Sequence, residues 1–154
     1  MKKIWIMCSI IIVVIIYFTY DYHWGDYVEL TFESVLYSND SDFEQSVLVS
    51  LKGDFYKSLI GNGMFQGQLS TDEKLKYDVK LKEEANIYRG FVFTRDSNKN
   101  NRTIGVVTVS HNLDKIWIQW NDVYELYALT EVNIAGPANS ASEAVQIARM
   151  MVEQ

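Results

Sequence analysis

Runs of alternating apolar and polar residues, separated by only a few turn-forming residues, restrict the fold of this chain more than any other feature. The clearest run is "LKYDVKLK" at Leu75–Lys82, in which apolar or aromatic residues alternate with charged ones. A side-chain period of two is that of a β-strand with one face in a core and the other in water. The gaps between runs are too short for crossover helices, so neighbouring strands are expected to pair antiparallel as a meander.

Similar runs extend over most of the chain after residue 26. The first two flank the polar turn "SNDSD" and predict a β-hairpin, whereas Gly53–Gly63 is compatible with one helical turn or a short strand. The expected strands are Tyr27–Tyr37, Phe43–Lys52, Met64–Ser70, Leu75–Lys82, Ile87–Thr94, Thr103–Ser110, Lys115–Trp120 and Tyr124–Ala135.

The last part of the chain changes to a helical pattern. Gly136–Pro137 ends the strand pattern, and Ser140 followed by Glu143 forms a capping box ahead of apolar residues at helical spacing, which predicts a helix over 140–153. The helix is expected to pack on the apolar face of the sheet or to plug the end of a barrel. The predicted fold class is mainly β with one C-terminal helix (α+β), as an antiparallel β-meander or partly closed barrel.

An uncharged apolar run, Ile4–Tyr20, precedes the strands. Its 17 residues would cover about 25 Å as a helix, at the short end of what the hydrocarbon layer of a bilayer requires. Lysines before the run and aromatic residues at both ends suit the two membrane interfaces. We therefore expect a transmembrane signal-anchor helix over 4–20, after a cytoplasmic stub of residues 1–3.

The flanking residues predict the orientation of this helix. Lys2 and Lys3 have no positive counterpart just beyond the run, which places the N-terminus in the cytoplasm and the C-terminal domain outside the cell. No pair of small residues marks a cleavage site after the run, so the anchor is expected to be retained. The expected protein is a single-pass plasma-membrane protein with a tether over 21–26 and an extracytoplasmic domain over 27–154.

The only cysteine, Cys8, lies near the start of the apolar run and follows Met7. A lipid-bearing cysteine follows the apolar region and is preceded by a small residue, so we interpret Cys8 as an apolar residue of the anchor helix. The part of the chain outside the membrane then has no cysteine. This composition favours a bacterial envelope over an oxidising animal compartment, where small domains often have disulfides.

Charge restricts the partners of the extracytoplasmic part. Without Lys2 and Lys3 it has 12 basic and 20 acidic residues, a net charge of about −8. This balance opposes binding to nucleic acid, anionic lipid headgroups and teichoic acids. The expected partners are the lipid bilayer, through Ile4–Tyr20, and a protein or glycan outside the cell.

Two segments resemble a known group of proteins. "YKSLIGNGMFQGQLSTDE" at Tyr56–Glu73, the alternating strands after it, and "IAGPANSASEAVQIARMM" at Ile134–Met151 resemble small membrane-anchored extracytoplasmic proteins of Gram-positive bacteria. The resemblance covers most of the extracytoplasmic domain. The group has no assigned activity, so the resemblance implies a location and a fold but supplies no functional residues.

Nucleophilic and metal chemistry receive little support from the sequence. The two histidines, His23 and His111, are far apart, and no G-x-S-x-G motif is present, so His111 is expected as a solvent-exposed turn residue. Without cysteines in the domain a zinc site is disfavoured. No metal and no cofactor is expected.

The sequence also gives little support to a calcium loop or to a specific pair of catalytic carboxylates. Asp96, Asn98 and Asn100 occupy the first ligand positions of a calcium loop, but Val107 stands where the bidentate glutamate belongs, so a hairpin turn is favoured. A hydrolase needs only two carboxylates across a cleft, and the sequence has 20 acidic residues with no means of choosing among them.

One aromatic cluster is a candidate binding site. Trp117, Trp120, Tyr124 and Tyr127 lie around the turn "NDV". Strand alternation places Trp120 with the core-facing isoleucines and Trp117 on the opposite, exposed face, unless a curled barrel buries both faces. An exposed tryptophan beside polar groups can stack on a sugar or anchor a protein partner.

These observations predict a membrane-anchored extracytoplasmic protein that is not an enzyme. Its domain is expected to bind or assist an envelope or secreted protein. The alternatives are binding of a cell-wall glycan and a carboxylate-dependent hydrolase at the cell surface. The sequence leaves open the ligand, the oligomeric state, closure of the barrel and cleavage of the anchor.

Overall fold

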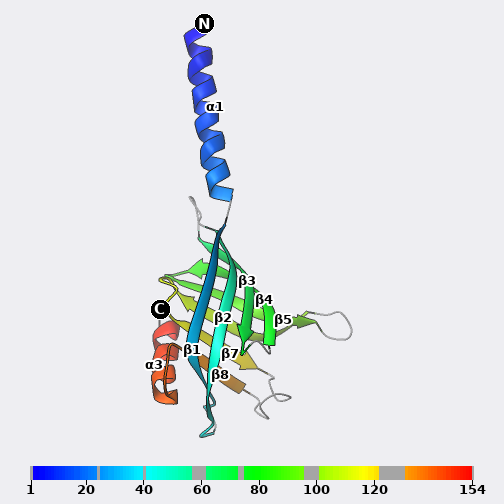
Figure 1. Cartoon of the computed structure of the whole chain (residues 1–154), viewed down its shortest axis with the longest axis vertical. Coiled ribbons are helices and arrows are strands. Elements are labelled where there is room, and N and C mark those ends of the chain that lie inside the picture. Colours follow the sequence, from blue (N-terminus) through cyan, green and yellow to red (C-terminus); the bar gives the residue numbers. More distant parts are fainter. Residues whose placement is uncertain are drawn as a thin grey trace.

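The computed structural model describes residues 2–23, 25–39, 41–56, 62–72, 75–95, 101–121 and 131–153. Its strands form a closed antiparallel barrel in which each pairs with its neighbour in sequence and β8 pairs back to β1 (Figure 1). The predicted antiparallel order is confirmed, and the sheet closes. The strands are β1 Asp26–Tyr37, β2 Glu44–Tyr56, β3 Met64–Thr71, β4 Leu75–Glu84, β5 Ile87–Arg95, β6 Asn101–Ser110, β7 Ile116–Asn121 and β8 Glu131–Gly136.

Side chains from every strand fill the barrel. In β4, Val79 and Leu81 are buried while Lys76, Asp78 and Lys80 point to solvent, as the alternation predicts. An eight-stranded barrel is just wide enough for side chains to fill its interior. The buried core residues are Phe32, Leu36, Val47, Val49, Leu51, Phe65, Leu69, Val79, Leu81, Tyr88, Val92, Val107, Val109, Ile116, Ile118, Trp120, Val132 and Ile134.

The barrel closes along a short seam. β1 pairs with β2 over its whole length but with β8 only from Val35 to Tyr37. The C-terminal helix, α3 (Ala141–Val152), lies against the outside of the barrel at this seam (Figure 1). It buries an apolar cluster with the outer faces of β1 and β8, comprising Val35, Tyr37, Ala135, Ala138, Ala144, Ile147 and Met151.

The predicted position of the helix is therefore wrong. It packs neither on the inner apolar face of the sheet nor in the end of the barrel, because strand side chains already fill the interior. β1 and β8 have apolar residues on both faces near the seam, and the outer set needs a cover. Burial there raises the pKa of Tyr37 to about 12.

Polar contacts hold the start of α3. Glu143 N–H donates to Ser140 Oγ at 3.4 Å, and the Glu143 carboxylate accepts from Asn139 N–H at 2.8 Å, so the capping residues are used almost as predicted. Ala141 N–H donates to the Glu44 carboxylate at 3.0 Å. This contact ties the helix to the start of β2.

Two strand boundaries differ from the prediction by more than two residues. β2 continues to Tyr56, so the start of the Gly53–Gly63 segment is a strand, which is one of the two predicted alternatives, and residues 57–61 lie outside the described residues. β8 begins at Glu131, and the earlier part of the predicted strand lies outside the described residues. The turn between β4 and β5 is two residues, Ala85 and Asn86, both with positive φ, which is typical of tight hairpins.

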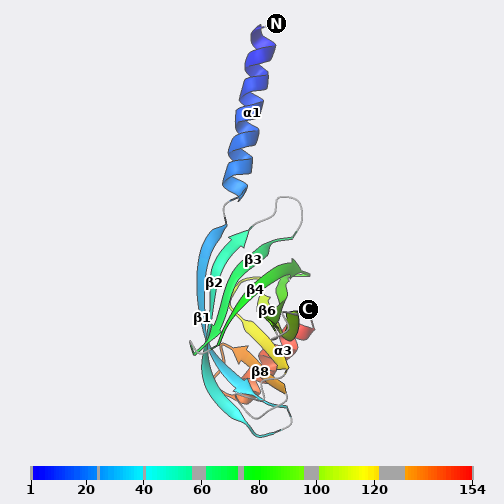
Figure 2. The same ribbon diagram turned by 90° about the vertical axis from the view of Figure 1, so that its right-hand side faces the viewer.

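The N-terminal helix, α1 (Lys2–His23), extends away from one end of the barrel (Figures 1 and 2). Trp5 and residues 7–16 are exposed. Within the described residues, no helix is both long and apolar enough to cross a membrane. The predicted span at Ile4–Tyr20 is thus helical, but it is not identified as a membrane span.

The contact between α3 and the seam can be tested with two neighbouring methionines. Met151 is 1% exposed and Met150 is 46% exposed, so Met151→Ala should lower the free energy of unfolding and Met150→Ala should not. We expect a loss of about 2–5 kcal/mol for Met151→Ala and a change within about 0.5 kcal/mol for Met150→Ala. Urea unfolding followed by tryptophan fluorescence measures both, and equal losses would contradict the packing described here.

Candidate functional site

The predicted aromatic site does not form an exposed patch in the described residues. Trp120 is 1% exposed inside the barrel, with its ring 5.9 Å from that of Tyr77. Trp117 is partly buried, because it packs against the cluster beneath α3. The expected free exposure of Trp117 is therefore wrong, and the cause is the helix on the outer face. Tyr124 and Tyr127 lie outside the described residues.

A different feature, an open groove of about 650 Å³, lies on the outer wall of β2, β3 and β4. The registers place two cross-strand rows of polar side chains along its floor. Together the rows place four charged groups and two amides on one stretch of wall. The first row is Lys52, Gln68 and Asp78, and the second is Asp54, Gln66 and Lys80.

A pair of glycines sets the shape of this wall. Gly53 and Gly67 face each other across β2 and β3 and also line the groove. A Cβ on Gly53 would meet the carbonyl oxygen of Gln66, and one on Gly67 would meet that of Lys52. Only glycine permits so close an approach, as at a sharp bend in a barrel. Figure 2 shows the strong curvature of the wall here.

Aromatic side chains border the groove. Phe93 and Tyr56 line it, and Phe93 is 51% exposed. Phe91, also on β5, is 53% exposed, and its ring centroid lies 6.3 Å from that of Phe93. The exposure of these two residues could have been predicted from the alternation of "IYRGFVFT", because Phe91 and Phe93 share their strand face with the charged Arg89.

A second cluster lies at the end of the barrel from which α1 extends. His111 Nδ1 lies 3.1 Å from Glu83 Oε1, and Gly63 N–H donates to Glu83 Oε2 at 2.7 Å. The His111 ring stacks on Tyr88 with centroids 6.0 Å apart. The pKa of Tyr88 is raised by burial and, to a smaller extent, by the negative charge of Glu83.

This cluster joins three connections between strands. Gly63 precedes β3, Glu83 is near the end of β4, and His111 is in the turn after β6. A carboxylate that orients an imidazole through Nδ1 also occurs in catalytic pairs. The Glu83 carboxylate holds both His111 and the Gly63 N–H, which is the geometry of a structural tie. His111 is exposed and lies in a turn, as predicted, but the sequence did not reveal its contact with Glu83, which is distant in the chain.

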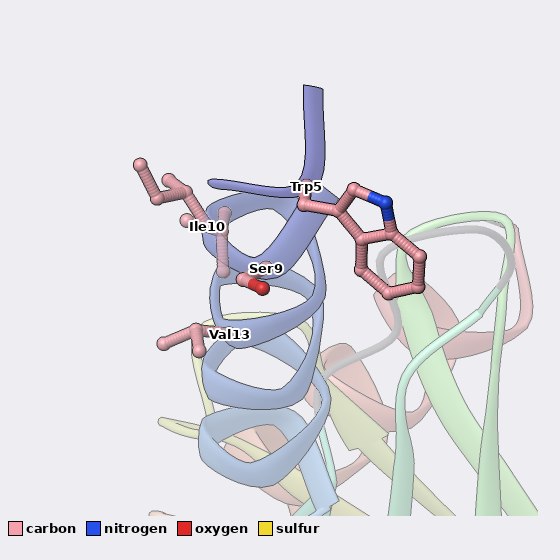
Figure 3. Close-up of a pocket in the computed structure, with 5 residues that line it drawn as sticks. Trp5, Ser9, Ile10 and Val13 are labelled. Atoms are coloured by element: carbon pink, nitrogen blue, oxygen red, sulfur yellow. The ribbon is translucent and has the colours of Figure 1, made fainter. Parts of the chain in front are cut away.

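Two other hollows are smaller than the groove. Figure 3 shows one of about 420 Å³ along α1, whose described lining residues are Trp5, Ser9, Ile10, Val13 and Val14 of that helix. A smaller one of about 300 Å³ lies between the β1–β2 hairpin and the connection from β8 to α3. No group of three or more potential metal-ligating side chains occurs among the described residues, and residues 96–100 lie outside them.

Comparisons with known proteins do not identify this chain. No family model, no curated protein and no solved structure matches it. The resemblance to membrane-anchored proteins of Gram-positive bacteria therefore stays a prediction. The groove on the outer wall is the candidate functional site because it combines volume, convergent polar groups and exposed aromatic rings.

The structural tie at Glu83 makes a testable prediction. Glu83→Ala should lower the free energy of unfolding by about 1–3 kcal/mol, because it leaves the buried Gly63 N–H without its acceptor. His111→Ala should cost less, about 0–1 kcal/mol, since the pair is partly exposed to solvent. Thermal unfolding of these variants, with exposed Glu84→Ala as the matched control, measures which substitution lowers the stability more. A larger loss for His111→Ala than for Glu83→Ala would contradict it.

Proposed function

We propose that this protein is a non-enzymatic binding domain, tethered to the outer face of a membrane by α1, and that the outer groove is its binding site. The observation that supports binding is the open groove of about 650 Å³, with a polar floor and aromatic borders, on a barrel whose interior is filled. The partner in this proposal is a macromolecule of the cell envelope or one secreted into it.

The proposed anchor is supported by the uncharged, apolar surface of α1. The uncharged run Ile4–Tyr20 corresponds to about 25 Å of helix, and the residues at both ends of α1 would lie at the interfaces of a hydrocarbon layer of about 30 Å. The exposed side chains include Trp5 and every apolar residue from Ile10 to Ile16. A helix whose described side chains are apolar and exposed on all sides is expected in lipid rather than in water.

The position of the groove suits a tethered domain. Gly25, at the start of the barrel, lies against Asp54 and Tyr56, so the groove is on the part of the wall nearer to α1. In Figure 1, β1, β2 and β3 run away from the end of α1, roughly along the direction of its axis. A partner could therefore enter from the side, close to the membrane surface.

The arrangement of acids favours binding over hydrolysis. Asp54 and Asp78 are the carboxylates that line the groove, on strands separated by β3 and two residues out of register. Strand spacing places their Cα atoms about 12 Å apart. Because strand side chains stand roughly perpendicular to the sheet, the two carboxyl groups stay about this far apart, whereas those of glycosidases lie about 5–9.5 Å apart across the bond that is cleaved. Two acids at this separation are better suited to accept hydrogen bonds.

Cys8 provides a test of the anchor without any substitution. It is the only cysteine and is exposed within α1. In native membranes a water-soluble maleimide should fail to label Cys8, because bilayer shields the helix, and detergent should restore labelling. The control is Cys8→Ser with Ser142→Cys on α3, which should react from outside intact cells. Labelling of Cys8 in intact membranes would contradict the anchor.

Photo-crosslinking tests the groove as the binding site. A photoreactive amino acid replaces Gln68 on the groove floor, or Gln146 on α3 as the matched control; both positions are exposed. Irradiation of cells that express the full chain should give a discrete adduct from Gln68 and none from Gln146. Adducts of equal yield from both positions, or none from Gln68, would contradict a binding site in the groove.

A further inference from the structure

We propose that the groove binds a neutral glycan chain, such as an uncharged segment of an envelope polysaccharide. This inference rests on the proposed function and narrows its ligand. It is drawn from three properties of the groove, namely its charge balance, its mixture of hydrogen-bond donors and acceptors, and its aromatic borders.

The charges of the described residues that line the groove balance one another. Lys52 and Lys80 face Asp54 and Asp78 across the floor, although the extracytoplasmic part as a whole has a net charge of about −8. The order of positive and negative side chains is reversed between the two rows, because β2 contributes a lysine to the first row and an aspartate to the second. Lys52 also lies 2.6 Å from Glu29. A highly charged ligand of either sign would gain little net attraction there.

The floor offers donors and acceptors side by side. Lysine side chains donate, aspartates accept, and the amides of Gln66 and Gln68 do both. A sugar hydroxyl likewise donates one hydrogen bond and accepts others, and successive hydroxyls of a glycan need such a mixed set of partners. The core of a protein–protein interface is instead depleted of charged residues. The floor therefore suits a polyhydroxylated chain better than a protein.

The borders provide the apolar part of recognition. A sugar ring has a face of C–H groups, which packs on an aromatic ring while its hydroxyls point sideways. Phe93, half-exposed at the edge of the floor, is placed for this contact, and Phe91 extends the aromatic surface away from the groove. A volume of about 650 Å³ is within the range of small-ligand sites.

The test uses the full chain in detergent micelles or lipid nanodiscs, with cellohexaose and chitohexaose as neutral probes and a sulfated oligosaccharide of similar length as the charged probe. Isothermal titration calorimetry measures the Kd at low and high salt. We expect saturable binding of at least one neutral probe, with little dependence on salt, and weaker binding of the charged probe.

Variants locate the binding. Phe93→Ala should weaken it about fivefold, as expected for loss of one stacking contact. Gln66→Ala combined with Gln68→Ala should weaken it further, and Gln146→Ala on α3 should leave it unchanged. These positions are exposed on the outer surface, and thermal unfolding verifies that each variant remains folded. Unchanged affinity in a folded Phe93 or glutamine variant would overturn the proposal.

The remaining outcomes separate this inference from the function on which it rests. No binding of either neutral probe at millimolar concentration, with a protein adduct from Gln68 in the crosslinking experiment, would overturn the glycan ligand and retain a binding domain. No binding and no adduct would overturn both. Tighter binding of the sulfated probe would overturn neutrality, and release of new reducing ends would replace binding with hydrolysis.

Discussion

The short pairing of β1 with β8 is the contact on which the rest of the structure depends. Without it the meander would be an open sheet with two exposed edges, each with unpaired backbone groups. The pairing extends only from Val35 to Tyr37, and α3 lies over it, burying apolar side chains from both strands. A hydrogen bond from Ala138 N–H to the Glu33 carbonyl (3.0 Å) continues the link beyond β8.

Closure has consequences for where a ligand can bind. Because side chains from the strands fill the interior, the binding site proposed for this protein lies on the outer surface. The outer surface is covered on one side of the barrel and open on another. The helix covers the side at β1, β7 and β8, whereas the wall of β2–β4 presents its polar residues to solvent. The glycine pair at Gly53 and Gly67 bends this exposed wall, so the same close approach that shapes the barrel also shapes the groove.

The strands and the C-terminal helix could be predicted because their signals are local. Alternation in β4 is complete over Leu75–Lys82, and Ser140 with Glu143 marks the start of α3 before any tertiary contact is considered. The candidate site could not be predicted in the same way. Alternation divides a strand into two faces and so predicts that Trp117 is exposed. Alternation does not show whether another element covers the outer face of the strand, as α3 does here.

The strands, their antiparallel order, the C-terminal helix and the acidic charge follow from the amino-acid sequence, because each depends on neighbouring residues or on composition. The sequence also contains the apolar segment from which a membrane anchor is proposed. Other features emerge only in the folded chain: the sheet closes, α3 lies outside the barrel, Glu83 meets His111, and six polar side chains from three strands form one floor. These features depend on register and curvature, which set the contacts between residues far apart in the chain.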